Sequence, residues 1–211
     1  MLNNGFPQRF VLAGIGTDVG KTLVSAILCA GLKSQYWKPI QSGLEGGTDT
    51  ENVQALSGLP AQYFLKEAFR LQLPASPHLA ARGEDVVIHA KDLNLPETDQ
   101  QLLIELAGGL SVPLNDDGLL MLDIVEQWRL PVVLVVNTYL GSINHSLLSI
   151  EALRNRGIPI FGLIFNEGDQ PASEEAIHKF GNVKVLASLP YFENVSEMKM
   201  DEIFKQYFVT A

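Results

Sequence analysis

The chain has 211 residues, of which 46% are hydrophobic and 18% charged, so it can form a sizeable core and is not an intrinsically disordered protein. Its 24 acidic and 15 basic side chains leave a net charge of −9, which predicts no nucleic-acid partner because binding phosphates requires lysine and arginine. A lone Cys29 excludes an internal disulfide, and without a leader-like start or a long apolar run we expect a cytoplasmic chain with no membrane partner.

Short apolar runs alternate with longer amphipathic stretches along the chain. Their periods predict, in chain order, a strand over 9–13, a helix over 22–34, a strand over 36–40 and a helix over 50–57. After an ambiguous segment over 60–100 they predict alternating strands and helices over 101–105, 118–129, 132–136, 143–156, 160–165, 173–180, 183–187 and 197–208. Continuously apolar strands separated by helices indicate a doubly wound α/β fold, a mostly parallel sheet with helices on both faces, here in one domain over 1–211.

A glycine-rich segment, GIGTDVGKT over 14–22, lies between the first predicted strand and the first predicted helix. Glycines allow several backbone N–H groups to face one anion, and a helix N-terminus adds partial positive charge. Lys21 can then reach the β- and γ-phosphates of ATP, and the Thr22 hydroxyl can ligate Mg²⁺. The context predicts a P-loop NTPase-like fold, although five residues rather than the usual four separate Gly14 from Gly20.

Two functions fit such a loop at this point. One is an ATP-dependent synthetase, and the other is a switch or partition-type ATPase that acts through a protein partner. Partition-type ATPases carry a second lysine just after the first glycine of the loop, where this chain has Ile15. The missing lysine weakens the partition-type interpretation.

Six segments, in order, resemble the dethiobiotin synthetase family of biotin biosynthesis. The family loop ends in Thr-(Glu/Asp)-Val-Gly-Lys-Thr with the same five-residue spacing, and its later segments read Lys-Pro-x-x-(Ser/Thr)-Gly, Ser-Pro-His, Glu-Gly-Ala-Gly-Gly, Leu-Gly-x-Ile-Asn-His and an Asn-ended strand. The matching segments here are Thr17–Thr22, Lys38–Gly43, Ser76–His78, Glu105–Gly109, Leu140–His145 and Gly162–Asn166. One departure is Leu106, where the family has a glycine.

The resemblance implies a homodimeric enzyme that condenses 7,8-diaminononanoate, CO₂ and ATP into dethiobiotin, ADP and phosphate. Lys38 follows a predicted strand, and the resemblance implies that it binds the carbamate and the transferring phosphate, with Lys21 as the second catalytic cation. Thr17 and Ser42 are implied to bind the substrate.

Further substrate contacts are implied for Gly141 and Asn144, which would reach the substrate carboxylate from the neighbouring subunit. The residues expected to contact ATP are Asp18, Val19, Gly20, Lys21, Thr22, Leu23, Asp49, Glu105, Asn166 and Pro190. Asn166 ends a predicted strand, and its amide suits the edge of an adenine.

A magnesium site is expected at Thr22, Asp49 and Glu105, because carboxylates beside a phosphate loop supply the oxygen ligands that Mg²⁺ prefers. Glu105 is expected to end its strand. Two alternatives stay open for the second carboxylate: Asp49 could instead be the N-cap of the helix that follows, and Glu51 could take its place at the metal.

Overall fold

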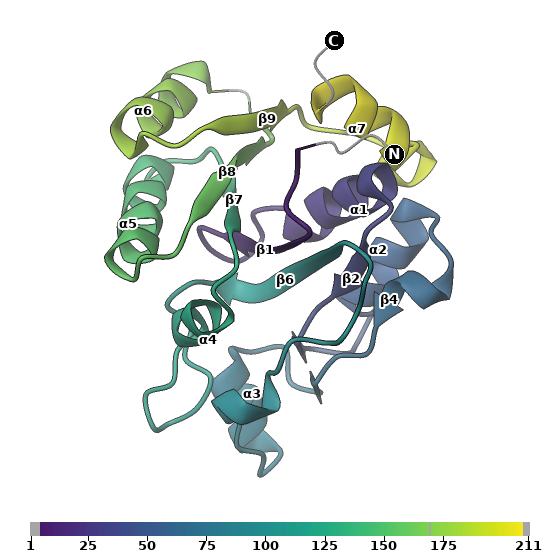
Figure 1. The fold of residues 1–211 in the computed structure, drawn as a ribbon, viewed down its shortest axis with the longest axis vertical. Helices are drawn as coiled ribbons and strands as arrows, with labels where there is room; N and C mark the ends of the chain where they lie inside the picture. Colours follow the sequence, from purple (N-terminus) through teal and green to yellow (C-terminus); the bar gives the residue numbers. More distant parts are fainter. Residues whose placement is uncertain (1–4, 169, 209–211) are drawn as a thin grey trace.

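The computed structural model describes residues 5–168 and 170–208. Seven strands form one sheet in the order β4-β2-β6-β1-β7-β8-β9, and all neighbouring pairs are parallel (Figure 1). This sheet confirms the predicted doubly wound α/β class. Its strands are β1 (Arg9–Gly14), β2 (Gln35–Trp37), β4 (Phe64–Leu65), β6 (Leu102–Gly109), β7 (Val132–Asn137), β8 (Ile160–Asn166) and β9 (Val185–Leu189).

Helices cover both faces of the sheet because its central strands are apolar on both faces (Figure 1). On one face lie α1 (Lys21–Leu32), α2 (Asp49–Ser57) and α7 (Met200–Phe208), and on the other lie α4 (Met121–Trp128), α5 (Ser142–Asn155) and α6 (Pro171–Gly181). The short α3 (Pro77–Gly83) joins the core on this second face but packs mainly against a separate two-stranded sheet. Within the described residues, no helix combines the length and apolar character needed to span a membrane.

The strand predicted over 36–40 is wrong, because the chain leaves the main sheet in the middle of it. β2 ends at Trp37, and β3 (Ile40–Ser42) pairs instead with β5 (Phe69–Leu71) in a separate two-stranded parallel sheet. Pro39 has no N–H with which to continue a strand pairing, and its carbonyl accepts hydrogen bonds from the backbone of Ala68 and Phe69. Lys38 therefore lies at the point where the two sheets separate.

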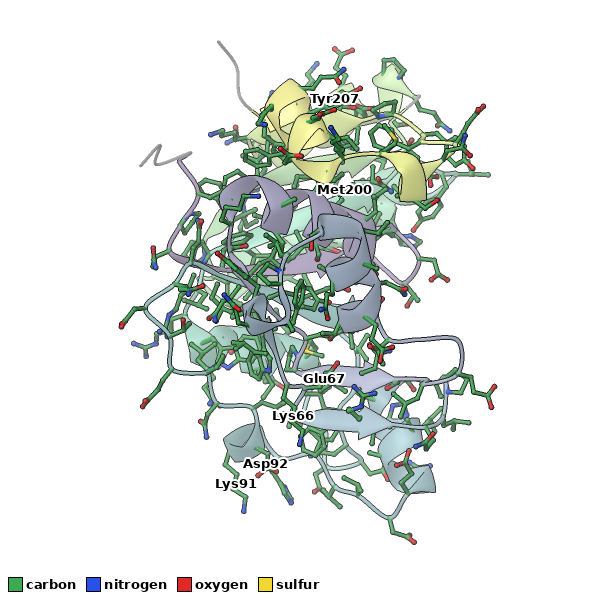
Figure 2. The ribbon with its side chains drawn as sticks, turned by 90° about the vertical axis from the view of Figure 1, so that its right-hand side faces the viewer. Lys66, Glu67, Lys91, Asp92, Met200 and Tyr207 are labelled. Carbon is green, nitrogen blue, oxygen red and sulfur yellow. The ribbon has the colours of Figure 1, made fainter. Side chains whose placement is uncertain are left out.

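The ambiguous segment over 60–100 supplies one strand of this small sheet, β5, and the elements around it. It contains the 3₁₀ turn η1 (Ala61–Tyr63), β4, β5, α3 and a second turn, η2 (Ala90–Asp92), while a third, η3 (Val195–Glu197), precedes α7. In Figure 2, Lys66 and Glu67 lie beside the small sheet, with α7 at one end of the molecule and η2 at the other.

One predicted strand is longer in the structure than the sequence indicated. The strand predicted to end at Glu105 continues to Gly109, so Glu105 lies inside β6 and pairs with Leu12 of β1. The sequence Ala-Gly-Gly does not favour a strand, but the parallel pairing of β6 with β1, including one irregularity, holds it extended. Both Glu105 and the end of β1 are thereby brought beside the glycine-rich loop.

Candidate functional site

The glycine-rich loop connects β1 to α1 at the carboxyl edge of the sheet. Gly20 is the residue before α1, and its φ of 86° is a left-handed conformation that favours glycine. A Cβ at this position would lie 2.1 Å from the Asn166 side-chain nitrogen, so the loop packs against the end of β8. Asn166 also donates to the Val19 carbonyl at 3.3 Å.

Lys21 is the first residue of α1, and its ammonium turns back onto the loop. Its Nζ donates to the Gly16 carbonyl at 2.9 Å. Burial lowers the pKa of Lys21 to about 8, although the nearby Glu105 carboxylate opposes this shift. Lys21 therefore carries a partly desolvated charge where an anion can be bound.

Lys38 forms ion pairs with two carboxylates, one from α2 and one from β6. Its Nζ lies 2.5 Å from Asp49 Oδ2 and 3.0 Å from Glu105 Oε1, and Lys38 is only 5% exposed. Burial disfavours its charge, but Glu105 and Asp49 outweigh this effect and raise the pKa of Lys38. In the same way Lys38 overcomes the effect of burial and lowers the pKa of Asp49. The two predicted metal carboxylates thus face a single cation.

Glu105 is oriented by two buried hydroxyls. Ser25 Oγ and Tyr36 OH both donate to Oε2, at 2.6 and 3.1 Å, which leaves Oε1 for Lys38. Burial and the Glu105 charge raise the pKa of Tyr36 well above its usual range, so the phenol keeps its proton. No motif pointed to either residue, although Ser25 lies one helical turn after Lys21, which is a detectable spacing.

The capping of α2 decides between the alternatives for the second carboxylate. Thr48 is the N-cap: its Oγ1 accepts from Glu51 N at 3.2 Å, and its own N–H donates to Glu51 Oε2 at 2.8 Å. The Asp49 N-cap hypothesis is therefore wrong, and Glu51 serves the capping box rather than the site. The Asp49 carboxylate is left to accept from Thr22 Oγ1 at 2.6 Å.

A cavity of about 840 Å³ opens over these groups. Among the predicted site residues it brings together Thr17, Asp18, Gly20, Lys21, Thr22, Lys38, Ser42, Asp49 and Glu105. The Ser42 hydroxyl is buried and has no hydrogen-bond partner within the described part of the chain. The lining also includes residues not predicted for the site: Gln41, Pro74, Ala75, Ser76, Pro77, Ala107, Gly108 and Val112.

Six predicted residues do not line this cavity, and two of them, Gly141 and Asn144, lie at the start of α5. Val19 and Leu23 flank it on the loop and in the first turn of α1. Asn166 and the exposed Pro190 lie at the ends of neighbouring strands, since Asn166 of β8 pairs with Leu189 of β9 and Pro190 comes directly after Leu189. Asn166 Oδ1 is buried and finds no partner among the residues described, so a free acceptor lies beside the loop.

Leu106 points away from the site. Successive residues of a strand face opposite sides of the sheet, so Leu106 packs in the core under α4 while Glu105 faces α1. The leucine in place of the family glycine therefore fills the core and does not crowd the phosphate loop.

Gly141 and Asn144 lie at the start of α5, outside the cavity. Gly141 precedes the helix with a φ of 105°, and the neighbouring Leu140 side chain is fully exposed to solvent. Within a single chain, the structure does not bring these two residues to Lys38. A smaller hollow of about 360 Å³ lies between the loop and α5, lined partly by Thr17 and Leu148.

A parallel sheet whose first strand leads through a glycine-rich loop into a helix carrying a buried lysine defines a P-loop nucleoside triphosphatase. The profile of a family described as an AAA domain matches residues 8–199. The chain is 50% identical over 200 residues to the "ATP-dependent dethiobiotin synthetase BioD" of Rhodopseudomonas palustris strain BisB18, covering 95% of each chain. It is 46% identical to the protein of that name from Nitrobacter hamburgensis, over 95% of this chain and 94% of the relative. The chain therefore belongs to the dethiobiotin synthetase family, which confirms the resemblance seen in its motifs.

Solved structures share the fold at much lower identity. A ParA family ATPase from Chlorobium tepidum has a TM-score of 0.55 at 12% identity, covering 94% of this chain and 92% of that one. A MinC:MinD cell division protein complex from Aquifex aeolicus contains a chain with a TM-score of 0.51 at 12% identity, covering 95% and 90%. At these identities the likeness supports the architecture alone, and it adds nothing to the hypothesis of a partition-type ATPase.

Proposed function

We propose that this chain is an ATP-dependent ligase that carboxylates 7,8-diaminononanoate and closes the ring of dethiobiotin. One amine adds to CO₂ and loses a proton to give a carbamate. A carbamate oxygen attacks the γ-phosphorus of ATP and ADP leaves. The second amine then attacks the carbonyl carbon of the mixed anhydride and loses a proton, phosphate departs, and a five-membered urea forms. The observation that carries the proposal is the buried Lys38 beside the phosphate loop, in the same cavity as the Ser42 hydroxyl, which has no hydrogen-bond partner among the described residues.

Two cations would neutralise the anions that meet in this cavity. Lys21 and the N–H groups at the start of α1 suit the β- and γ-phosphates. Lys38 would bind the carbamate oxygen as it meets the γ-phosphate, and both anions would gain most from that charge in the transition state. Ser42 and Thr17 line the same cavity and would hold the diamine. Asp18, exposed in the loop, would face the nucleotide side.

The donors fit Mg²⁺ as the accompanying ion. Thr22, Asp49 and Glu105 supply a hydroxyl and two carboxylates, and hard oxygen ligands of this kind, together with nucleotide phosphates, are typical of magnesium. Both carboxylates pair with the Lys38 ammonium, so their oxygens lie close enough together to share one cation. When bound, the ion would neutralise charge on the phosphates.

The nucleotide base is assigned to the ends of β8 and β9. Asn166 offers an amide whose Oδ1 is buried without a partner among the described residues, an acceptor that an adenine amine would satisfy. Pro190 follows β9 and offers an apolar edge beside it. Val19, Gly20 and Leu23 complete the contacts of the loop with ATP.

A homodimer would complete the substrate site. Gly141 and Asn144 lie at a helix start whose free N–H groups suit a carboxylate, but they are absent from the cavity of their own chain. The exposed Leu140 and Leu148 beside them suit burial against a second copy. The single buried cysteine is consistent with a reducing cytoplasm, and neither nucleic acid nor membrane enters the proposed reaction.

The test is product formation by the purified chain. ADP release should require 7,8-diaminononanoate and bicarbonate together, with dethiobiotin formed in equal amount. ATP hydrolysis that ignores the diamine and responds to a macromolecular partner would refute the proposal.

A further inference from the structure

Gln41 is a buried amide in β3 that lines the cavity and is 5% exposed. Its Nε2 donates to the carbonyls of Ser42 and Gly43, at 3.2 and 3.1 Å. Its Oε1 accepts from the backbone N–H of Asp49 at 3.1 Å. Two carbonyls on one side and an N–H on the other define the orientation of the amide, because reversing it would place like groups together.

The bond to Asp49 connects two elements that meet at the site. Asp49 is the first residue of α2, and the first N–H groups of a helix have no partner within the helix. Gln41 supplies that partner from the small sheet, eight residues earlier in the chain. The position of the helix start in turn sets where the Asp49 carboxylate meets Thr22 and Lys38.

The bonds to Ser42 and Gly43 act at the end of β3. They hold the backbone of the strand end that carries the Ser42 hydroxyl. Gly43, whose φ is 80°, packs closely against Pro74, since a Cβ on Gly43 would lie 3.0 Å from the Pro74 side chain. One side chain thus holds both the start of α2, with its Asp49 carboxylate, and the end of β3, with its Ser42 hydroxyl.

We propose that Gln41 is a positioning residue that couples the affinity for the metal–nucleotide complex to the affinity for the diamine, by holding Asp49 and Ser42 in register. The proposal rests on the function proposed above. Removing the amide should release both sides at once, so both affinities should fall together. If Gln41 only stabilised the fold, removing its amide would lower the stability of the protein and leave both affinities unchanged.

Gln41→Met tests this coupling, since methionine keeps the length and volume of the side chain but forms none of the three bonds. Loss of a group that orients a metal ligand typically costs 10–100-fold in metal affinity. We expect about a tenfold or greater rise in the MgCl₂ concentration that half-saturates binding of a fluorescent N-methylanthraniloyl derivative of ADP. The KM for 7,8-diaminononanoate should rise by a comparable factor.

Thr50→Val is the matched control. Thr50 lies in the same helical turn as Asp49, and its hydroxyl donates at 2.6 Å to Glu67, which lies beside the small sheet in Figure 2. This variant also removes one bond that holds the start of α2, but it does so outside the cavity. It should lower the melting temperature while leaving the magnesium requirement and the KM for the diamine within about twofold of wild type.

The outcomes separate the two proposals. If Gln41→Met behaves like Thr50→Val, or shifts only one of the two affinities, the coupling is refuted. If the methionine variant does not fold, Gln41→Ala provides the same measurements, because it only removes atoms. A wild-type chain that makes no dethiobiotin refutes the proposed function, whereas an active wild type with an unaffected Gln41→Met refutes the inference alone.

Discussion

Replacing Lys38 by methionine should destabilise the folded protein as well as slow its reaction. The substitution preserves the shape of the side chain but removes the cation that pairs directly with Asp49 and Glu105. Breaking a buried ion pair by removing one partner costs about 3–5 kcal/mol. Glu105 is 1% exposed but the Asp49 side chain is 27% exposed, so water can relieve part of the penalty. The lower end, about 3 kcal/mol, is therefore the expected loss.

This loss should appear in thermal unfolding. For a chain of this size each kcal/mol corresponds to about 2–4 °C, so Lys38→Met should lower the melting temperature by roughly 6–12 °C. Adding Asp49→Asn should cost less than the sum of the two single changes, because neutralising one carboxylate removes the repulsion. Lys66→Met, at an exposed lysine, is the control and should leave the melting temperature within about 2 °C of wild type.

The same variant should lose turnover while keeping ATP binding. A group that stabilises charge in the transition state typically contributes about 10²–10³ in rate. We expect dethiobiotin formation from the diamine, bicarbonate and ATP to slow at least about a hundredfold, with ATP affinity by calorimetry near normal. A melting temperature unchanged within about 2 °C, together with turnover within tenfold of wild type, would refute both the ion-pair and the carbamate assignments.

Three further changes test the rest of the site. Lys21→Ala should abolish single turnover at saturating ATP, and turnover within tenfold of wild type would exclude Lys21 from phosphoryl transfer. Because burial lowers the pKa of Lys21 from 10.5 to about 8, its charge is present below that pH and lost above it. ADP affinity should therefore weaken as the pH rises through about 8, and fluorescence titrations that show no such weakening would contradict this expectation. The free energy of unfolding should rise between about pH 8 and 10.5, because the folded protein then no longer buries the charge while the unfolded chain still carries it. Gly20→Ala should prevent nucleotide binding measured by calorimetry, since its Cβ would meet Asn166 at 2.1 Å and its φ is 86°; normal affinity would show that the loop adapts. Leu140→Asp should give a folded but inactive monomer in sedimentation, because the side chain is fully exposed within one chain; an active monomer would remove the predicted role of Gly141 and Asn144.

Local chemistry explains what could be predicted from the sequence. The P-loop could be predicted because its parts are consecutive in the chain: an apolar strand, a glycine-rich loop that ends in Lys21 and Thr22, and a helix. The same holds for the alternation of apolar runs and amphipathic stretches, which indicated a parallel sheet with helices on both faces. Six short segments in family order, among them Lys38–Gly43, together suggested the family.

Tertiary structure decided what depends on contacts between distant segments. Lys38 meets Glu105 across 67 residues, and Ser25 meets Glu105 across 80, so no local pattern could show that these side chains orient one carboxylate. The division of the predicted strand over 36–40 between two sheets depended on the pairing of β3 with β5. The cap of α2 is by contrast a local feature, because Thr48 and Glu51 form a capping box whose Thr-x-x-Glu pattern is present in the sequence. Sequence alone therefore determined which chemical groups the protein carries and its class of fold, whereas packing across the sheet decided which of those groups share a cavity, because hydrogen bonds and ion pairs depend on distances that only the folded chain sets.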